Sequence, residues 1–458
     1  TKILDTGLST EKYLMHNPSR EKMQRIMKSQ KEILKKLGIE RLNQMQLSSN
    51  EAIINYNNVI IQSPTGTGKT LAFLLPLIND IERGLQQVQC LIIVPSRELA
   101  IQIEGVVRQM GSGIKCNSVY GGQSFNQDKI NLKHIPSLVV GTPGRVADHI
   151  KRNTFSLDYI KSFVIDEFDK SLEIGFEDEL KSICSALYDV KKRILTSATK
   201  SIDIPRYVNL DKPVTINTSD QGEGEMKMEL IESKNKDKLD RLAEVLNILG
   251  NDSGIVFCNY KDSIQRVSNF LLDKGILHGR FYGGMEQQDR ELSLTKFRNG
   301  SHKIIVATDL ASRGLDVERI NYIIHYHLPS NENEFIHRNG RTARMDKDGI
   351  VYVLKHHSDP SPPFIPHLQL AKFENKEYEA HQNWVTLMIS GGRKDRISKG
   401  DVAGFLIKKG ELKNDEVGLI ELKQKVTFVA IEKKSSTKIV KNINGLRLKT
   451  KKIRAALV

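Results

Sequence analysis

Long apolar runs and paired cysteines are both missing from this sequence of 458 residues. No stretch of about 18 or more residues is both apolar and uncharged, which excludes a helix that crosses a bilayer. The four cysteines lie far apart and form no Cys-x-x-Cys pair, which argues against a zinc site and a disulfide framework. The first residues, from Thr1, contain no apolar segment of the secretory type. We therefore expect a cytoplasmic protein that does not contact membranes.

The charge of the chain is concentrated at one end. The formal net charge is +14, and residues 383–458 contain 18 Lys+Arg against 7 Asp+Glu, a net of +11. A basic segment of this kind is typical of a domain that binds a polyanion such as RNA. The alternative is a solvated surface, which would usually mix the two signs more evenly.

Short β-branched runs alternate with helical stretches in two successive series. The first series is 59–61, 91–94, 138–140, 163–165 and 194–195, and the second is 255–257, 280–282, 304–307, 322–324 and 350–353. Such runs are typical of parallel strands that are buried on both faces and joined by crossover helices. The sequence therefore predicts two tandem α/β domains with parallel sheets.

Shifts in composition predict the domain boundaries. The predicted parts of the chain are a first α/β domain over 1–218, a polar linker over 219–228, a second α/β domain over 229–356, a proline-rich connector over 357–382 and a small domain over 383–458. For the last domain we expect the order β-α-β-β-α-β of RRM-like α+β folds. Its strands are predicted at 385–389, 417–422, 426–431 and 446–453, and its helices at 399–409 and 437–443.

A glycine-rich turn from Ser63 to Thr70 joins the first predicted strand to an apolar helix. This is the context of a phosphate-binding loop, in which glycines let backbone N–H groups approach phosphate oxygens. The residues expected to bind ATP here are Thr65, Gly66, Thr67, Gly68, Lys69 and Thr70. Lys69 should contact the β- and γ-phosphates, and the Thr70 hydroxyl should contact Mg²⁺. A turn without a ligand is the alternative, but it leaves the Lys-Thr pair unexplained.

Two carboxylates follow the strand predicted at 163–165. We expect Asp166 to hold Mg²⁺ through water and Glu167 to orient the attacking water. An acidic pair at the end of a strand is often only turn chemistry. The phosphate-binding loop in the same domain favours the catalytic interpretation.

These motifs make the sequence resemble the DEAD-box RNA helicases. Asp-Glu-Phe-Asp at 166–169 is similar to their Asp-Glu-Ala-Asp box. Further motifs follow in the family's order at 95–100, 121–122, 142–145, 197–199, 287–290, 307–316 and 337–344. The resemblance covers about residues 30–356. It implies two RecA-like domains, ATP and Mg²⁺ as cofactors, and local unwinding or remodelling of RNA driven by ATP hydrolysis.

The resemblance also assigns roles around the nucleotide. Gln46 would read the adenine and Asp316 the ribose. Arg341 and Arg344 would act with Lys69 and Glu167 in catalysis, with Arg344 as the arginine finger.

Further roles concern coupling and RNA. Ser197 and Thr199 would link Asp169 to His337, so that hydrolysis is coupled to domain closure. The positions that the resemblance places on the RNA backbone are Arg97, Gly122, Thr142, Arg145, Thr308 and Arg313. Hydroxyls, arginines and glycine N–H groups contact phosphate without reading sequence.

Three positions depart from the family pattern. Phe168 stands where the family has Ala, Leu42 and Asn43 where it has Pro-Thr, and Ala343 where it has Gly. We expect altered packing around the Phe168 ring but intact catalysis, because both carboxylates remain. An ATP-gated RNA clamp that acts as an assembly scaffold with little unwinding is the alternative that these departures support. A DNA helicase motor is a further alternative, which the box, the Ser-Ala-Thr motif and the basic domain disfavour.

The last domain resembles the RNA-binding domain of the DbpA group in residues 386–394, 401–404 and 426–430. RRM domains stack bases on aromatic residues of the central strands, and here only Phe428 occupies such a position. We therefore expect binding by shape and charge, through Arg393, Lys394, Arg396, Lys399 and the cluster at 449–454. The resemblance points to a hairpin of large-subunit ribosomal RNA and a role in ribosome assembly as a monomer. A basic packing domain without a ligand is the alternative.

Overall fold

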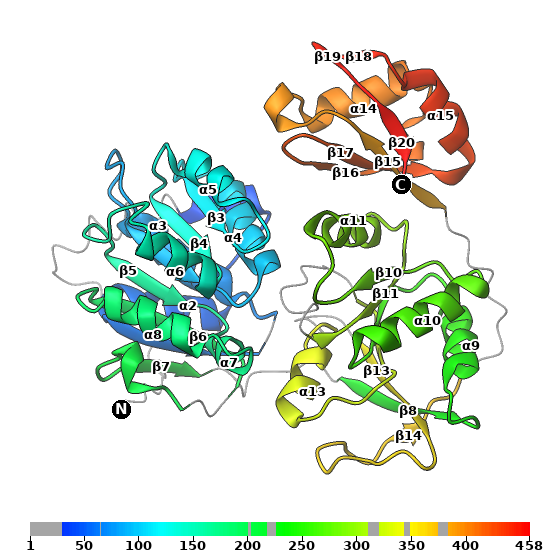
Figure 1. The fold of residues 1–458 in the computed structure, drawn as a ribbon, viewed down its shortest axis with the longest axis horizontal. Helices are drawn as coiled ribbons and strands as arrows, with labels where there is room; N and C mark the ends of the chain where they lie inside the picture. The colour runs from blue at the N-terminus through cyan, green and yellow to red at the C-terminus, as the bar shows by residue number, and fades with distance from the viewer. Residues whose placement is uncertain are drawn as a thin grey trace. The chain divides into compact units, whose positions relative to one another are not determined.

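The computed structural model describes residues 30–64, 66–199, 203–217, 226–309, 320–342, 349–373 and 383–458. The chain divides into two compact units, the first comprising the chain up to residue 223 and the second most of the remainder (Figure 1). Within these ranges no helix is long and apolar enough to span a membrane. The first unit is built around one parallel sheet and is here called domain 1. The second contains another parallel sheet, domain 2, and the C-terminal domain (383–458).

Domain 1 is built on a seven-stranded sheet in the order β3-β4-β2-β5-β6-β1-β7. All neighbouring strands are parallel. The strands are β1 (Asn58–Gln62), β2 (Cys90–Ile93), β3 (Cys116–Val119), β4 (Leu138–Gly141), β5 (Ser162–Ile165), β6 (Lys192–Ser197) and β7 (Val214–Asn217). β2, β4 and β5 are buried along their whole length, which explains their continuous apolar sequence.

Helices cover both faces of this sheet. They are α2 (Gln44–Asn55), α3 (Lys69–Asp80), α4 (Arg97–Met110), α5 (Phe125–Leu132), α6 (Pro143–Lys151), α7 (Phe168–Glu173), α8 (Glu177–Ala186) and the 3₁₀ turn η1 (Arg206–Val208). Two cores result, because successive side chains of a strand point to opposite faces. Val59 and Ile61 pack with α3 and α4, whereas Ile60 packs in the cluster that contains Val146 of α6 and Leu180 of α8.

Domain 2 repeats this plan. Its parallel sheet has the order β10-β11-β9-β12-β13-β8-β14. The strands are β8 (Lys227–Ser233), β9 (Gly254–Phe257), β10 (Gly279–Phe281), β11 (Ile304–Ala307), β12 (Tyr322–His325), β13 (Ile350–His356) and β14 (Gln369–Leu370), and the helices are α9 (Leu239–Leu249), α10 (Lys261–Asp273), α11 (Gln287–Arg298) and α13 (Glu332–Asn339). The two orders match position by position, so β8 corresponds to β1, β12 to β5 and β13 to β6. The predicted tandem α/β architecture is confirmed.

The C-terminal domain has an antiparallel sheet in the order β16-β17-β15-β20. Its elements are β15 (Trp384–Ile389), η2 (Arg393–Asp395), α14 (Lys399–Lys408), η3 (Asn414–Glu416), β16 (Val417–Leu422), β17 (Thr427–Glu432), η4 (Lys433–Ser435), α15 (Ser436–Ile443), β18 (Arg447–Leu448), β19 (Lys451–Lys452) and β20 (Ala455–Leu457). The two helices and one face of the sheet enclose a core that includes Leu387, Val429 and Leu406.

One strand prediction was wrong. The segment 446–453 forms the small antiparallel pair β18–β19, and the fourth strand of the sheet is β20. Lys449 has a positive φ of 54°, so the chain turns where a continuous strand was expected. Strands β3, β7, β8 and β14 were missed because they are partly exposed and carry mixed polar residues. Residues 219–225 of the predicted linker (219–228) lie outside the described residues, and β8 begins at Lys227, before the predicted end of the linker.

Within the second unit, the C-terminal domain is bonded to domain 2. Asn299 Nδ2 donates to Thr386 Oγ1 at 2.9 Å, and the hydroxyls of Ser301 and Thr386 lie 2.8 Å apart. Arg298, the last residue of α11, donates two hydrogen bonds to Glu421 on β16. The outer face of the C-terminal sheet is therefore a contact surface with domain 2.

Candidate functional site

The turn after β1 has the backbone of a phosphate-binding loop. Gly66 and Gly68 adopt positive φ angles of 90° and 87°, which side chains with a Cβ rarely adopt. A Cβ on Gly68 would also lie 2.3 Å from Gln46 Nε2. Glycine is therefore required at this position. Thr65, also predicted to bind ATP, lies outside the described residues.

The loop encloses the Lys69 ammonium group. Lys69 Nζ donates to the carbonyl oxygens of Ser63 at 2.5 Å and Pro64 at 2.8 Å, and the side chain is 9% exposed. Burial lowers the pKa of Lys69 to about 8, although the carboxylates of Asp166 and Glu167 oppose this shift. A buried cation beside backbone carbonyls is suited to receive a phosphate.

Helix α2 braces the same loop. Asn43 caps α2 by accepting from the Gln46 N–H at 2.8 Å, and its own N–H donates to Gln46 Oε1 at 3.0 Å. Asn43 Nδ2 also donates to the Thr67 carbonyl, and Gln46 Nε2 donates to the Gly68 carbonyl. The family has Thr at the position of Asn43. The Asn43 side chain also supplies an oxygen that caps the helix. Gln46 lies beside the loop and is 7% exposed.

The acidic pair lies at the end of β5, two strands from β1 in the sheet. Asp166 is 2% exposed and accepts a hydrogen bond from the Thr196 hydroxyl, which in turn accepts from the Glu167 N–H at 3.0 Å. Glu167 has a positive φ of 50°, and its Oε1 pairs with Lys170 Nζ at 2.9 Å. Lys170 is fully buried, so the carboxylate is held in a fixed position.

These residues suit a magnesium ion. Burial, and then the neighbouring Glu167 charge, raises the pKa of Asp166 to about 6. A cation beside it would relieve both effects. Thr70 is the second residue of α3, which begins after β1 at the same edge of the parallel sheet as the acidic pair. The described residues contain no cluster of three or more His, Cys, Asp or Glu side chains that would hold a metal by themselves. Mg²⁺ is usually bound by one or two protein groups together with phosphates and water.

Asp169 is the centre of a hydrogen-bonded group. Its Oδ2 accepts from Ser197 Oγ at 2.9 Å, from the N–H groups of Ala198 at 3.1 Å and Thr199 at 3.3 Å, and from Thr199 Oγ1 at 3.3 Å. The Ser-Ala-Thr motif therefore surrounds the last carboxylate of the acidic box. β5 and β6 are adjacent strands, which explains why the two motifs meet.

The Phe168 ring points into the core rather than into the site. Phe168 is fully buried in the cluster that also contains Leu180 and Ile183 of α8. The larger side chain is thus accommodated between α7 and α8, and Asp166, Glu167 and Asp169 remain at the edge of the sheet.

The predicted RNA-backbone residues of domain 1 follow β2, β3 and β4, the other half of the same sheet edge. Arg97 begins α4, and its guanidinium lies on Gly122, where a Cβ would be 2.5 Å from Arg97 Nη1. Thr142 precedes α6 and is 8% exposed. Arg145 donates to the carbonyls of Tyr120 and Gln123. The structure therefore brings these four residues together around the loop at 120–123.

A buried carboxylate holds Arg145 in place. Asp128 Oδ2 lies 3.3 Å from Arg145 Nε and 3.4 Å from His149 Nε2. Asp128 and His149 are both fully buried. His149 also bonds to the Thr154 hydroxyl through Nδ1 at 2.8 Å.

In domain 2, three predicted residues lie in the described ranges. Thr308 follows β11, and His337 and Arg341 lie on and just after α13, with exposures of 9%, 6% and 4%. Arg313, Asp316 and Arg344 lie outside the described residues, so their expected roles remain predictions.

Sequence reasoning assigned no individual role to Arg338, Lys170 or Asp128. Arg338 is 1% exposed and donates to both carboxylate oxygens of Asp309, to Asn259 Oδ1 at 2.8 Å and to the His327 carbonyl at 2.6 Å. The spacing of Lys170 three residues after Glu167 on a helix was a usable signal. The Arg338 and Asp128 contacts join distant segments and had no local signal.

The C-terminal domain presents its predicted basic residues to solvent. Arg393, Lys394, Arg396 and Lys399 are all exposed. The β18–β19 pair lies beside them, because Lys449 Nζ donates to the Arg396 carbonyl and Lys451 Nζ pairs with Asp395.

Phe428 lies on the other, docked face. It is opposite Met388 and Glu421 in the strand pairing and is 8% exposed. Glu421 is the residue bonded to Arg298 of domain 2. The position expected from the RRM comparison is therefore buried, on the sheet face whose Glu421 contacts domain 2, rather than open for base stacking.

Comparison with known protein families gives three matches in chain order. Residues 43–206 match the DEAD/DEAH box helicase family, residues 237–346 the helicase conserved C-terminal domain, and residues 386–457 the DbpA RNA binding domain.

Individual relatives cover nearly the whole chain. It is 31% identical over 447 residues to the ATP-dependent RNA helicase DbpA of Escherichia coli, covering 93% of this chain and 96% of that protein. The Bacillus subtilis ATP-dependent RNA helicase DbpA is 29% identical over 457 residues, covering 92% and 95%. Among solved structures, S. cerevisiae Dbp5 bound to RNA and ADP BeF3 superposes with a TM-score of 0.64 at 26% identity, covering 71% of this chain and 88% of that one.

Proposed function

The chain belongs to the DEAD-box family of ATP-dependent RNA helicases, in the group with a DbpA RNA-binding domain, and we propose that it remodels ribosomal RNA during assembly of the large ribosomal subunit. The enzyme hydrolyses ATP in response to RNA, as its family does. The observation that supports this function most strongly is the arrangement at one edge of the domain 1 sheet. Nucleotide residues follow the neighbouring strands β1, β5 and β6, and RNA-backbone residues follow β2, β3 and β4.

Hydrolysis is proposed to use the buried groups around the phosphate-binding loop. Lys69 would transfer its hydrogen bonds from the loop carbonyls to the β- and γ-phosphates. Glu167, fixed by Lys170, would orient the attacking water. Mg²⁺ would neutralise charge on the phosphates and would be held through Asp166 and Thr70. Gln46, beside the loop, would contact the adenine.

Coupling to RNA is proposed to run through the Asp169 group. Ser197 and Thr199 both bond to Asp169, so a change at the acidic box reaches the Ser-Ala-Thr motif directly. His337 would receive this change. The remaining nucleotide contacts proposed in the second unit are Asp316 to the ribose and Arg341 and Arg344 to the transferring phosphoryl group.

RNA strands are proposed to be held by their backbones. Arg97, Gly122, Thr142 and Arg145 supply cations, a hydroxyl and a glycine amide around one loop, and Thr308 and Arg313 would contribute from the second unit. None of these groups reads base identity, which suits an enzyme that acts on many RNA sequences.

Targeting is proposed to come from the C-terminal domain. Its docked face leaves the basic residues Arg393, Lys394, Arg396 and Lys399 available for RNA. A structured hairpin of large-subunit ribosomal RNA is the proposed partner, by analogy with the group. We propose that the enzyme is cytoplasmic and acts as a monomer. Gel filtration of the full chain would test whether it is monomeric.

The test is steady-state ATPase activity with a large-subunit ribosomal RNA fragment, an unrelated RNA and DNA, at one fixed salt concentration. We expect the strongest stimulation by the ribosomal fragment. The double variant Lys394→Glu/Arg396→Glu should lose this preference and keep its response to unrelated RNA. The matched control is Lys408→Glu/Lys409→Glu, which reverses two exposed lysines at the end of α14. Equal stimulation by every RNA, unchanged by the first double variant, would contradict ribosomal targeting while leaving the helicase assignment in place.

An ATP-gated clamp with little unwinding is the alternative function. Its sequence support was the Phe168 ring and the altered segment before Gln46. The ring packs in the core and Asn43 caps α2, so neither change displaces a carboxylate or the loop. ATP-dependent RNA binding with no turnover on any RNA would favour the clamp.

A further inference from the structure

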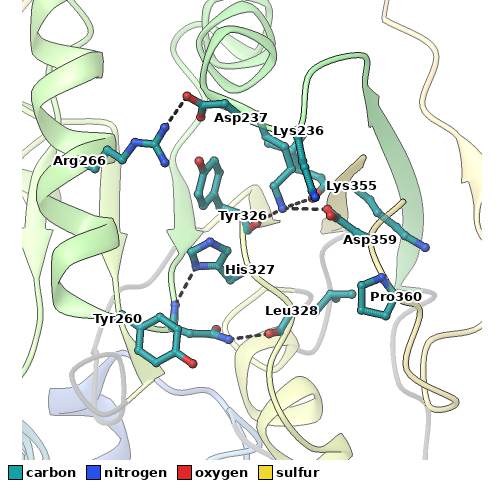
Figure 2. Close-up of a pocket in the computed structure, with 13 residues that line it drawn as sticks. Lys236, Asp237, Tyr260, Arg266, Tyr326, His327, Leu328, Lys355, Asp359 and Pro360 are labelled. Atoms are coloured by element: carbon teal, nitrogen blue, oxygen red, sulfur yellow. Dashed lines mark hydrogen bonds and ion pairs between the residues drawn. The ribbon is translucent and has the colours of Figure 1, made fainter. Parts of the chain in front are cut away.

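Domain 2 contains a cavity that none of the residues proposed to bind ATP lines. It has a volume of about 440 Å³, which is enough for a ligand of the size of a nucleotide. Figure 2 shows aromatic side chains along one wall and lysines with Asp359 and Pro360 along the other. Its lining residues are Lys236, Asp237, Lys238, Asn259, Tyr260, Arg266, Tyr326, His327, Leu328, Leu354, Lys355, Asp359 and Pro360.

The cavity occupies a position in domain 2 that corresponds to the nucleotide site of domain 1. Its walls come from the end of β13 and from the segments that follow β8, β9, β12 and β13, together with Arg266 of α10. By strand order, β8, β12 and β13 correspond to β1, β5 and β6, which precede the phosphate-binding loop, the acidic pair and the Ser-Ala-Thr motif. Ligands of open α/β sheets bind at the carboxyl ends of the strands. No glycine loop is present here, so binding would depend on side chains.

The cavity is lined by more basic than acidic side chains, so positive charge remains to bind an anion. Four basic residues face two acidic ones. Lys238 is fully engaged, because its Nζ donates to the carbonyls of Tyr326 at 2.7 Å and Leu354 at 3.3 Å and pairs with Asp359 at 3.3 Å.

The remaining three basic side chains keep donors available. Arg266 pairs with Asp237 through one terminal nitrogen, and Lys355 donates to the Ser361 hydroxyl. Lys236 is exposed. The net charge of the cavity is therefore positive, which favours a phosphate.

The opposite wall suits a flat ring. Tyr260 lies at the edge of the cavity and is 69% exposed. His327 accepts the Asn259 N–H through Nδ1 at 3.4 Å. Burial, followed by the Lys238 and Arg338 charges, lowers the pKa of His327 to about 4, so the ring is neutral at pH 7. A neutral ring that accepts through Nδ1 carries its hydrogen on Nε2 as a donor.

We propose that this cavity binds a nucleotide, either free or as one unit of an RNA strand, with its phosphate on Lys236 and Lys355 and its base against Tyr260. The site lies within domain 2 and uses none of the residues proposed for ATP hydrolysis. Its existence is therefore independent of the proposed function.

A ligand in the cavity would contact residues that are hydrogen-bonded to helix α13. Asn259 Oδ1 and the His327 carbonyl both accept hydrogen bonds from Arg338, which is buried on that helix. A ligand that contacts Asn259 or His327 thus contacts residues that fix the position of Arg338.

The test is the rate at which an amine-acylating reagent modifies individual lysines of the full chain, read by mass spectrometry. The Lys69→Ala background removes binding at the predicted ATP site, and the probes are pyrophosphate, AMP and a short oligouridylate. We expect each effective probe to slow acylation of Lys236 and Lys355 by at least about threefold. Lys234 is exposed in the same loop but does not line the cavity, so it serves as the internal control and should be unaffected.

The pattern of protection identifies the ligand. Protection by AMP indicates a free nucleotide, and protection by oligouridylate alone indicates a unit of RNA. Tyr260→Ala should weaken protection by AMP and leave protection by pyrophosphate unchanged. No protection of Lys236 and Lys355 by any probe, or equal protection of Lys234, would overturn the proposal. Because the readout is not ATP hydrolysis, this result would leave the proposed function untouched.

Discussion

Arg298 and Glu421 form a two-point ion pair that joins the end of helix α11 to strand β16 of the C-terminal domain. Arg298 Nε lies 2.7 Å from Glu421 Oε1, and Nη2 lies 2.8 Å from Oε2. Their side chains are 28% and 16% exposed. Parallel hydrogen bonds of this kind fix the angle between partners as well as the distance. The pair therefore sets how the C-terminal domain is held on domain 2.

Separation of this pair should loosen the docked face. Trp384, the single tryptophan of the chain, begins β15 beside Gly300, so its fluorescence reports on the contact. We expect Arg298→Ala to shift Trp384 emission to longer wavelength and to cost about 1–3 kcal/mol in stability of the second unit. The charge exchange Arg298→Glu/Glu421→Arg should restore much of both. Arg241→Ala, which removes an arginine that pairs with Glu244 and lies over the Phe373 ring within domain 2, is the control. Unchanged emission in Arg298→Ala would show that the pair does not maintain docking.

Replacement of Glu167 should stop turnover without preventing binding. In Glu167→Gln the side chain can still accept from Lys170 but no longer withdraws a proton from water. We expect ATP hydrolysis to fall by at least about 100-fold, while ATP-dependent RNA binding, measured by fluorescence anisotropy, is retained. Glu177→Gln, at an exposed position on α8, is the control. Turnover at the wild-type rate would remove Glu167 from its proposed role.

The raised pKa of Asp166 predicts a pH effect with a defined sign. The pKa rises from 3.8 to about 6, through burial and then the Glu167 charge, so the folded state binds this proton more tightly than the unfolded state. The contribution to stability is present below the lower pKa and is lost as pH rises through the higher one. Between pH 5 and pH 7 the loss should be about 1 kcal/mol.

The measurement is urea unfolding without Mg²⁺ or nucleotide, compared with Asp166→Asn, which cannot titrate. The stability of wild type relative to the variant should decrease from pH 5 to pH 7. A stability difference between wild type and variant that does not change with pH would contradict the raised pKa of Asp166. With Mg²⁺ and ATP, hydrolysis should decline as pH falls through the pKa, and the bound cation should move this decline to lower pH.

Loss of the buried Asp128 carboxylate should weaken RNA binding through Arg145. In Asp128→Asn the charge that faces Arg145 Nε and His149 Nε2 is removed. We expect the RNA concentration for half-maximal ATPase to rise about 3- to 10-fold, with little change in maximal rate or in the KM for ATP. Asp148→Asn, at an exposed position on α6, is the control. Asp128→Glu should recover part of the RNA response. A fall in maximal rate with unchanged RNA dependence would indicate general destabilisation rather than positioning.

Much of domain 1 could be predicted from sequence because its signals are local. The runs at 59–61, 91–94 and 163–165 became β1, β2 and β5, since strands buried on both faces must be apolar along their length. Gly66 and Gly68 predicted the backbone of the loop, because their positive φ angles are restricted to few residue types. The partly exposed strands β3 and β14 gave no such signal.

The sequence by itself determined the family, the order of the domains and the residues that carry chemistry. It did so because phosphate binding and hydrolysis require particular side chains at short, fixed spacings.

Only the tertiary structure decided which distant residues support them. Arg338 meets Asp309, Asp128 meets Arg145, and Glu421 meets Arg298 across 123 positions of the chain. Such contacts depend on the order of strands in a sheet and on the docking of one domain on another, neither of which is encoded in local spacing. For the same reason Phe428, which by sequence resembled a base-stacking residue, is buried on the sheet face whose Glu421 contacts domain 2.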